Sequence, residues 1–162
     1  MVAGPSRSAA QTDTIQSARV VIAAFDGTKL GYITLGASTP AEVGQTLQNV
    51  GGLGPARENQ VTFRIGEVPI RPRVLYTPPQ TMNQLYFQND TLVLVVEGQP
   101  HGLPNTRAEF VARYPDARET HRESGWYELQ TRLSGCIWLI AVFGAGSDRL
   151  ESDGYAYLCH RS

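Results

Sequence analysis

Residues 39–43 read TPAEV and residues 106–110 read TRAEF. In each stretch a Thr hydroxyl can cap the first turn of a helix, and the Glu three residues later can reach back to the Thr amide. Pro40 also suits the first helical position. Gly51 is expected to end the first helix and Pro115 the second. The sequence therefore predicts two short helices that begin in the same way.

Strand-like segments lie before, between and after these helices. Asp26-Gly27 separates two apolar runs and suits the positive φ of a tight turn, which predicts a hairpin at the start. Further β-rich segments are 60–65, 73–76, 84–87 and 91–96 after the first helix, and 126–131, 136–143 and 154–159 after the second.

The order of these segments predicts the fold class. We expect an α+β protein in which an N-terminal hairpin precedes two units, each a helix followed by antiparallel strands. One mainly antiparallel sheet would carry the helices on one face. Residues 1–17 are small and polar, which predicts a disordered lead. Residues 18–162 are expected to form a single domain, with two repeats, 18–98 and 99–162, as an interpretation of its pattern.

The charge of the chain disfavours nucleic acid as a partner. The 14 Lys and Arg residues are balanced by 15 Asp and Glu residues, so the net charge of -1 attracts no phosphate backbone over distance. The mixed-charge stretch 113–123 is expected to be a solvated loop. The longest apolar runs are far shorter than the roughly 20 residues of a transmembrane helix, so no membrane span is predicted.

Two cysteines indicate either a disulfide or a pair of thiols. Cys136 and Cys159 flank a predicted hairpin whose turn lies near Gly146. Opposed cysteines in antiparallel strands can form a disulfide, and two buried reduced thiols are the alternative. A disulfide favours an oxidising compartment, so we expect an extracytoplasmic location, periplasmic or secreted, with a cytoplasmic one as the alternative.

The sequence contains no recognisable catalytic set. Cys136 lies in an apolar strand rather than beside a base, which argues against a nucleophilic role. His101, His121 and His160 lack the close spacing of metal-binding pairs. We therefore expect no catalytic residue, no metal and no cofactor, and a non-enzyme is favoured over an enzyme.

One stretch resembles a known family. Residues 32–43 read YITLGASTPAEV, where a strand leads through Gly and small residues into the helix start, and a strand turn follows Phe87. This pattern resembles the outer-membrane assembly lipoproteins of the OmlA/SmpA type and the tandem β-lactamase inhibitor protein. The resemblance implies a small extracytoplasmic module that binds other proteins across a sheet face and performs no chemistry.

The chain also departs from that family. It has one candidate cysteine pair rather than one in each half, and no lipid-anchor cysteine near its N-terminus. Inhibition of a β-lactamase is therefore not expected from the resemblance.

Aromatic side chains are the strongest candidates for a binding surface. If the cysteines define one face of the final hairpin, alternation places Trp138, Tyr155 and Tyr157 on that face. Tyr86 and Gln88 are expected to point outward in the first unit. Tyr and Trp give large contact area at low entropic cost, so the predicted partner-binding residues are Tyr86, Gln88, Trp126, Trp138, Tyr155 and Tyr157. The alternative is that the aromatics cover a core under the helices.

These observations support three functional hypotheses. The leading one is a non-enzymatic protein-binding or adaptor module that presents an aromatic and polar sheet face to a protein partner. The alternative is a small-molecule-binding protein or small enzyme with a pocket between sheet and helices, where His101, Glu109 or Tyr127 supplies polar contacts. The third is a homodimer through a strand edge, because the run 91–96 is aliphatic and would be an association risk if exposed.

Overall fold

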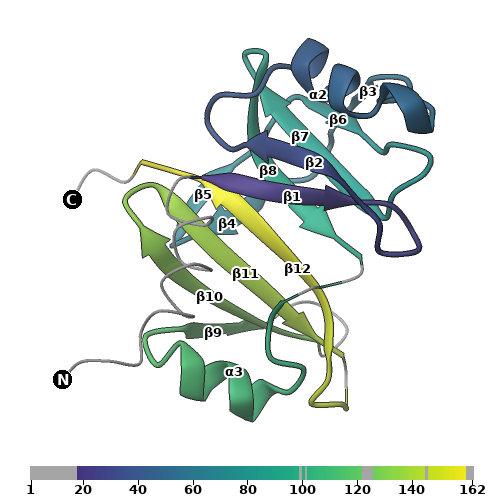
Figure 1. Ribbon diagram of the computed structural model, residues 1–162. Coiled ribbons are helices and arrows are strands. Elements are labelled where there is room, and N and C mark those ends of the chain that lie inside the picture. The colour runs from purple at the N-terminus through teal and green to yellow at the C-terminus, as the bar shows by residue number, and fades with distance from the viewer. Residues whose placement is uncertain (1–17, 99, 101, 122–125, 145, 160–162) are drawn as a thin grey trace, which may run out of the picture.

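The computed structural model describes residues 18–98, 100, 102–121, 126–144 and 146–159. Its main feature is an antiparallel sheet of eight strands in the order β3-β6-β7-β8-β12-β11-β10-β9 (Figure 1). Its strands are β3 (Arg57–Glu58), β6 (Val74–Tyr76), β7 (Asn83–Gln88), β8 (Thr91–Glu97), β9 (Arg118–His121), β10 (Tyr127–Ser134), β11 (Ile137–Phe143) and β12 (Leu150–Tyr157). The last strand along the chain, β12, thus lies in the middle of the sheet.

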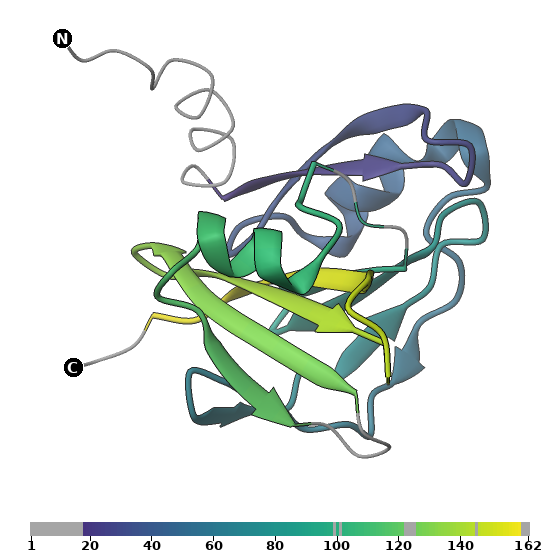
Figure 2. The same ribbon diagram turned by 90° about the horizontal axis from the view of Figure 1, so that it is seen from below.

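Two hairpins lie outside this sheet, on opposite faces of it (Figure 2). The hairpin of β1 (Arg19–Ala23) and β2 (Lys29–Thr34) packs on one face with helices α2 (Pro40–Thr46) and α3 (Arg107–Arg113). We call this the helix face. The hairpin of β4 (Phe63–Ile65) and β5 (Val68–Ile70) crosses the other face, which we call the open face.

Both helices begin where their caps predict. The Thr39 hydroxyl accepts a hydrogen bond from the Glu42 amide at 3.2 Å, and the Glu42 carboxylate accepts one from the Thr39 amide at 2.9 Å. The Thr106 hydroxyl likewise accepts from the Glu109 amide at 3.2 Å. After α2 a short 3₁₀ helix, η1 (Gln48–Val50), ends at Gly51, whose φ of 95° is left-handed and suits glycine.

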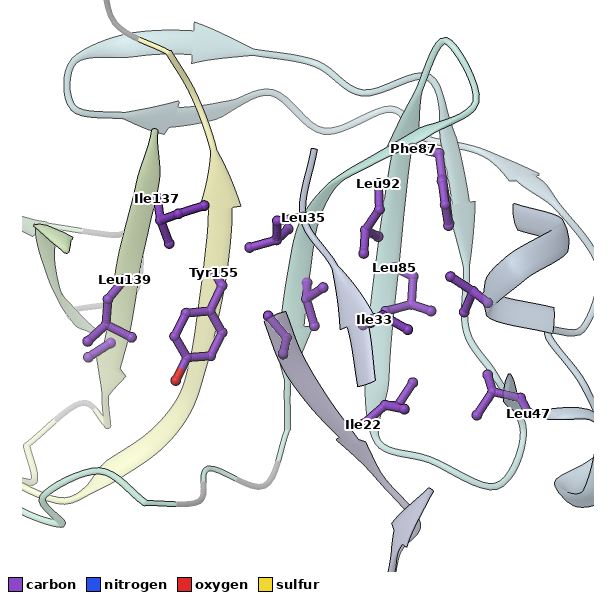
Figure 3. Packing of buried hydrophobic residues seen from close by; sticks show 14 of the residues in the cluster. Ile22, Ile33, Leu35, Leu47, Leu85, Phe87, Leu92, Ile137, Leu139 and Tyr155 are labelled. Carbon is purple, nitrogen blue, oxygen red and sulfur yellow. The ribbon is translucent and has the colours of Figure 1, made fainter. Parts of the chain in front are cut away.

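The main core lies between the sheet and the elements on its helix face (Figure 3). Side chains from both halves of the chain meet there, including Ile22, Ile33, Leu35, Leu47, Leu85, Phe87, Leu92, Phe110, Ile137, Leu139, Phe143 and Tyr155. A second, smaller cluster on the open face packs under the β4–β5 hairpin. One sheet therefore carries apolar side chains on both faces.

The expected fold class is wrong. The protein is mostly β, and the α-helices of the described residues, α2 and α3, have seven residues each. Two turns of helix cannot cover an eight-stranded sheet, so the β1–β2 hairpin supplies part of the cover. The strands after the two helices belong to one eight-stranded sheet rather than to two helix-plus-strand units. The shared capping sequence misled the prediction because it determines only how a helix begins.

The aliphatic run 91–96 forms an interior strand rather than an edge. β8 pairs with β7 on one side and with β12 on the other, and burial on both faces accounts for its composition. The edges of the sheet are β3 and β9. β9 falls in the mixed-charge stretch expected to be a loop, and charged side chains are typical of an edge strand.

The disulfide between Cys136 and Cys159 is confirmed, with Cα atoms 4.4 Å apart. The strands leading to it have a register one residue away from the expected one, since Trp138 pairs with Ala156 rather than Tyr157. Cys159 lies beyond the end of β12, so the ladder does not fix its position. A one-residue shift exchanges the faces of a sheet.

Candidate binding groove

A pocket of about 780 Å³ lies on the open face of the sheet, and we call it the groove. Its floor contains Ile140, Gly154 and Val96, which lie opposite one another on β11, β12 and β8. Val142 and Ser152 form the next pair on the same face and extend this floor. The floor is therefore mainly apolar and crosses the middle of the sheet.

Gly154 creates the hollow in this floor. A Cβ atom at this position would lie 2.8 Å from the Val95 carbonyl oxygen, so a side chain requires the backbone to move. No side chain therefore fills the space between Ile140 and Val96. Glycine weakens a strand interior and often marks a place where a ligand or another backbone approaches closely.

Polar side chains of β9 and β10 form one wall of the groove. Gln130 Nε2 donates a hydrogen bond to Glu128 Oε2 at 2.7 Å, and Thr120 Oγ1 donates to the same oxygen at 3.2 Å. Two donors fix the direction of the Glu128 carboxylate. The groove therefore combines an apolar floor with an oriented acidic group at its side.

The β4–β5 hairpin and the residues before it form a second wall, which contacts the first. Gln130 Nε2 also donates to the Arg64 carbonyl oxygen at 2.7 Å, and Gln130 Oε1 accepts from the Gly66 amide at 3.0 Å. Gln130 is only 5% exposed, so its amide group links the two walls from a buried position. The exposed ion pair of Arg118 with Glu67, at 3.3 Å, adds little to this link.

Aromatic contacts hold the same hairpin on the sheet. The rings of Phe63 and Tyr86 meet edge to face with centroids 5.0 Å apart. Gly66 lies so close to the Trp138 ring that a Cβ atom would be 2.5 Å from it. The hairpin is thus a fixed wall of the groove.

The rim of the groove continues its apolar character. Trp126 precedes β10 and lines the groove on the side of Glu128. Val61, before β4, lines the other side and is 52% exposed. Apolar surface thus extends from the floor to the solvent on two sides.

No protein-family model, curated protein or solved structure matches this chain. Among the described residues no helix is long and apolar enough to cross a membrane.

The structure separates the predicted partner-binding residues. Trp126 lines the groove. Tyr86 and Trp138 lie on the same face but hold the β4–β5 hairpin, and Tyr86 is only 4% exposed rather than outward-pointing. Gln88, at the end of β7, accepts a hydrogen bond from the Arg73 amide at 3.1 Å.

The other two predicted residues lie on the helix face. Tyr155 is buried in the main core (Figure 3). Tyr157 packs against Gly36, where a Cβ atom would be 2.4 Å from its ring. The expectation that both tyrosines share a face with Trp138 is wrong, because it depends on the shifted register.

The alternative hypothesis placed a pocket between the sheet and the helices, whereas the groove lies on the opposite face of the sheet. The space between sheet and helices is filled by the main core. Glu109 is exposed and contacts Thr106 at the start of α3, and the Arg107 guanidinium stacks 4.4 Å from the Tyr127 ring. His101 lies outside the described residues.

Sequence reasoning misses the residues that shape the groove. Glu128 and Gln130 alternate with apolar residues in β10, which is also the pattern of ordinary solvent-facing positions. Gly154 is the first residue of the predicted strand 154–159, and a glycine at that position indicates only where the strand begins. The polar alternation was the available signal, but it does not show that the β4–β5 hairpin covers this face.

Behind the floor, on the helix face, lies a row of buried polar side chains. Asn83, Glu97 and Asp153 are opposite one another on β7, β8 and β12 and are 5%, 4% and 1% exposed. The group that interacts with the Asp153 carboxyl group is the carboxyl group of Glu97, and among the described residues no donor outside this pair satisfies either Asp153 oxygen. Burial first, and then the charge of Glu97, raises the pKa of Asp153 well above its usual value. We call Glu97 and Asp153 the acid pair.

Proposed function

We propose that this chain is a non-enzymatic protein-binding module whose groove receives an apolar side chain of a protein partner. The observation that supports this is an apolar floor, deepened at Gly154, between two fixed walls. A side chain seated there buries its own apolar surface and the part of Val96 that remains exposed, because Ile140 and Val142 are already only 8% and 5% exposed. This burial stabilises by about 25 cal/mol per Å² of apolar area.

The rim favours a protein segment over a compact ligand. Trp126 and Val61 extend the apolar surface beyond the floor, so a chain that passes over the groove can contact both. The polar wall at Thr120 and Glu128 provides a hydrogen-bonding side for the backbone of that chain.

The contacts in the wall support binding rather than chemistry. Among the described residues, the ionisable side chains that border the groove are Arg64, Glu67, Glu128 and Asp153. The Glu67 carboxylate pairs with Arg118, the Glu128 carboxylate accepts hydrogen bonds from Thr120 and Gln130, and the Asp153 carboxyl group lies on the helix face. Each of these contacts positions a carboxyl group, which supports a binding role for the wall.

A peptide selection tests the proposal. A random peptide library is selected on the immobilised protein, and selected peptides are measured by fluorescence polarisation. We expect a shared apolar residue in the binders, and at least a tenfold loss of affinity in Ser152→Trp, whose indole fills the groove. Ala112→Trp places the same side chain on the exposed surface of α3 and serves as the control. Peptides that bind Ser152→Trp as tightly as the parent contradict the proposal.

A small amphipathic molecule is the second candidate occupant. The groove volume of about 780 Å³ lies within the range of about 300–1,000 Å³ typical of ligand pockets. Native mass spectrometry of protein purified from its source cells tests this alternative. A bound small molecule that is absent from Ser152→Trp would favour it over a protein segment.

The disulfide supports an extracytoplasmic location as part of this proposal. Source cells lysed directly into denaturant with an alkylating reagent, followed by mass spectrometry, test it, since unfolding exposes both cysteines and Cys136 and Cys159 then stay unlabelled only where they are bridged. Relationship to the OmlA/SmpA and β-lactamase-inhibitor family stays a prediction.

A further inference from the structure

The two halves of the eight-stranded sheet are joined by one short ladder, which we call the seam. It contains four residue pairs between β8 and β12: Leu94–Ala156, Val95–Tyr155, Val96–Gly154 and Glu97–Asp153. The strands on one side of the seam come from residues 57–97, and those on the other side from residues 118–157. The seam is the only ladder between the two sides among the described strands.

The acid pair forms the last rung of the seam at the groove. The neighbouring rung, Val96–Gly154, forms the groove floor on the opposite face of the same two strands. A force that separates Glu97 from Asp153 therefore acts directly on the floor.

Groups from the surrounding elements also face the acid pair. Asn83 of β7 lies opposite Glu97 and carries no charge. Tyr155 lies next to Asp153 on the same face of β12. Burial raises the pKa of Tyr155 most, Tyr114 at the end of α3 contributes to the rise, and the charge of Arg113 opposes it. Arg113 also donates a hydrogen bond to the Gly102 carbonyl oxygen at 3.4 Å. His101, between β8 and α3, lies outside the described residues.

We propose that the acid pair makes the groove proton-dependent. While the pair holds a proton, the seam is closed and the groove floor is formed. When both groups ionise, β8 and β12 separate at the groove end and binding weakens. This regulation rests on the proposed function of the groove.

Burial is the physical reason. Ionisation of Asp153, which is almost completely buried, takes a charge out of water and adds repulsion from the neighbouring Glu97 carboxylate, and fraying of the last rung restores water to Asp153. The raised pKa of Asp153, caused first by burial and then by Glu97, agrees with a proton held above the usual carboxyl range. Affinity at the groove is therefore expected to fall as pH rises through the titration of the pair.

Hydrogen exchange tests the seam without any ligand. Amide exchange in segments 94–97 and 153–156 is measured by mass spectrometry over a pH series and divided by the intrinsic rate at each pH. We expect protection to fall with rising pH in the parent and to stay constant in Asp153→Asn. Glu151→Gln, an exposed carboxylate on the same strand, is expected to behave as the parent. Should Asp153→Asn not fold, Glu97→Gln takes its place.

The result that overturns the inference is a parent seam whose protection does not change with pH, or a change that survives Asp153→Asn. The series is repeated with calcium chloride and with EDTA. A seam that closes with Ca²⁺ and opens with EDTA at constant pH assigns the pair to a cation instead of a proton.

A neutral probe, Nile red, separates this inference from the proposed function. We expect Nile red to bind the parent more tightly at low pH, with no pH dependence in Asp153→Asn. Equal binding to the parent and to Ser152→Trp contradicts the groove as the binding site, whatever the seam does. Binding that is lost in Ser152→Trp but independent of pH overturns the inference and leaves the function intact.

Discussion

Gly66 shows how a missing side chain positions a wall of the groove. Its φ of 56° is left-handed, and the Trp138 ring occupies the place of a Cβ atom. We expect Gly66→Ala to lower the free energy of unfolding by about 2–4 kcal/mol, because backbone strain adds to steric overlap. Urea unfolding measures this loss.

Gly52 offers a matched control for that substitution. Its φ is 71°, yet a Cβ atom there would meet nothing within 4 Å. Gly52→Ala is expected to cost only the backbone strain, about 1 kcal/mol. Equal losses for the two variants would show that Trp138 does not hold the hairpin through Gly66.

Asp153 predicts a particular direction of pH dependence. Its raised pKa means that the native protein holds this proton more tightly than the unfolded chain does. The contribution of Asp153 to the free energy of unfolding is therefore most favourable at low pH. It is lost as pH rises from the usual carboxyl range through the raised native pKa.

Asp153→Asn is expected to remove that decline. Its free energy of unfolding relative to the parent should rise with pH across this window, as measured by urea unfolding at several pH values. A difference that stays constant with pH contradicts the assignment. Glu151→Gln is again the control.

Single residues could be predicted from sequence where a local rule decides their role. Thr39 and Glu42 form the predicted cap because both partners lie within one turn. Trp138 and Tyr155 could not be assigned to a face, because that depends on a register that shifts near the ends of β11 and β12.

At the scale of elements, the disulfide closes the β11–β12 hairpin over a sequence separation of 23 residues. A loop of this length restricts the unfolded chain enough to stabilise the protein by about 3 kcal/mol. We expect a reducing agent to lower the free energy of unfolding of the parent by this amount. A Cys136→Ala, Cys159→Ala double variant should start lower and not respond. A parent that is equally stable with and without reductant contradicts this prediction.

Elements that depend on local signals could be predicted from the sequence, but their arrangement in the sheet could not. The Asp26-Gly27 turn predicts the β1–β2 hairpin, which the structure confirms. The β4–β5 hairpin was missed because its strands are short and one contains Pro69. Without that hairpin the groove has no second wall, so the candidate site could not be found from sequence alone.

At the scale of the whole molecule, the main core joins both halves of the chain. Leu85 of β7 and Leu139 of β11 are both fully buried in it, although they come from opposite sides of the seam. We expect one cooperative unfolding transition, with tryptophan fluorescence and circular dichroism giving the same midpoint. Leu85→Ala and Leu139→Ala should each lower the stability of that single transition by about 2–5 kcal/mol.

Two separate transitions, each sensitive to one of these substitutions, would show that the halves unfold independently. The predicted homodimer is also a property of the whole molecule. The edge available to it is β9 or β3 rather than the run 91–96. Sedimentation velocity over a range of concentrations tests this prediction.

The central place of β12 has a consequence for folding during synthesis. The whole of β8 is synthesised long before β12 emerges from the ribosome. During this interval the edge of β8 that pairs with β12 in the folded protein has no partner strand. Contacts this distant in sequence form slowly, and an unpaired aliphatic edge promotes aggregation during that interval. Nascent chains stalled before β12 should therefore recruit chaperones more strongly than chains stalled after it. Folding of this protein therefore depends on β12 pairing with β8 before the exposed edge of β8 associates with other chains.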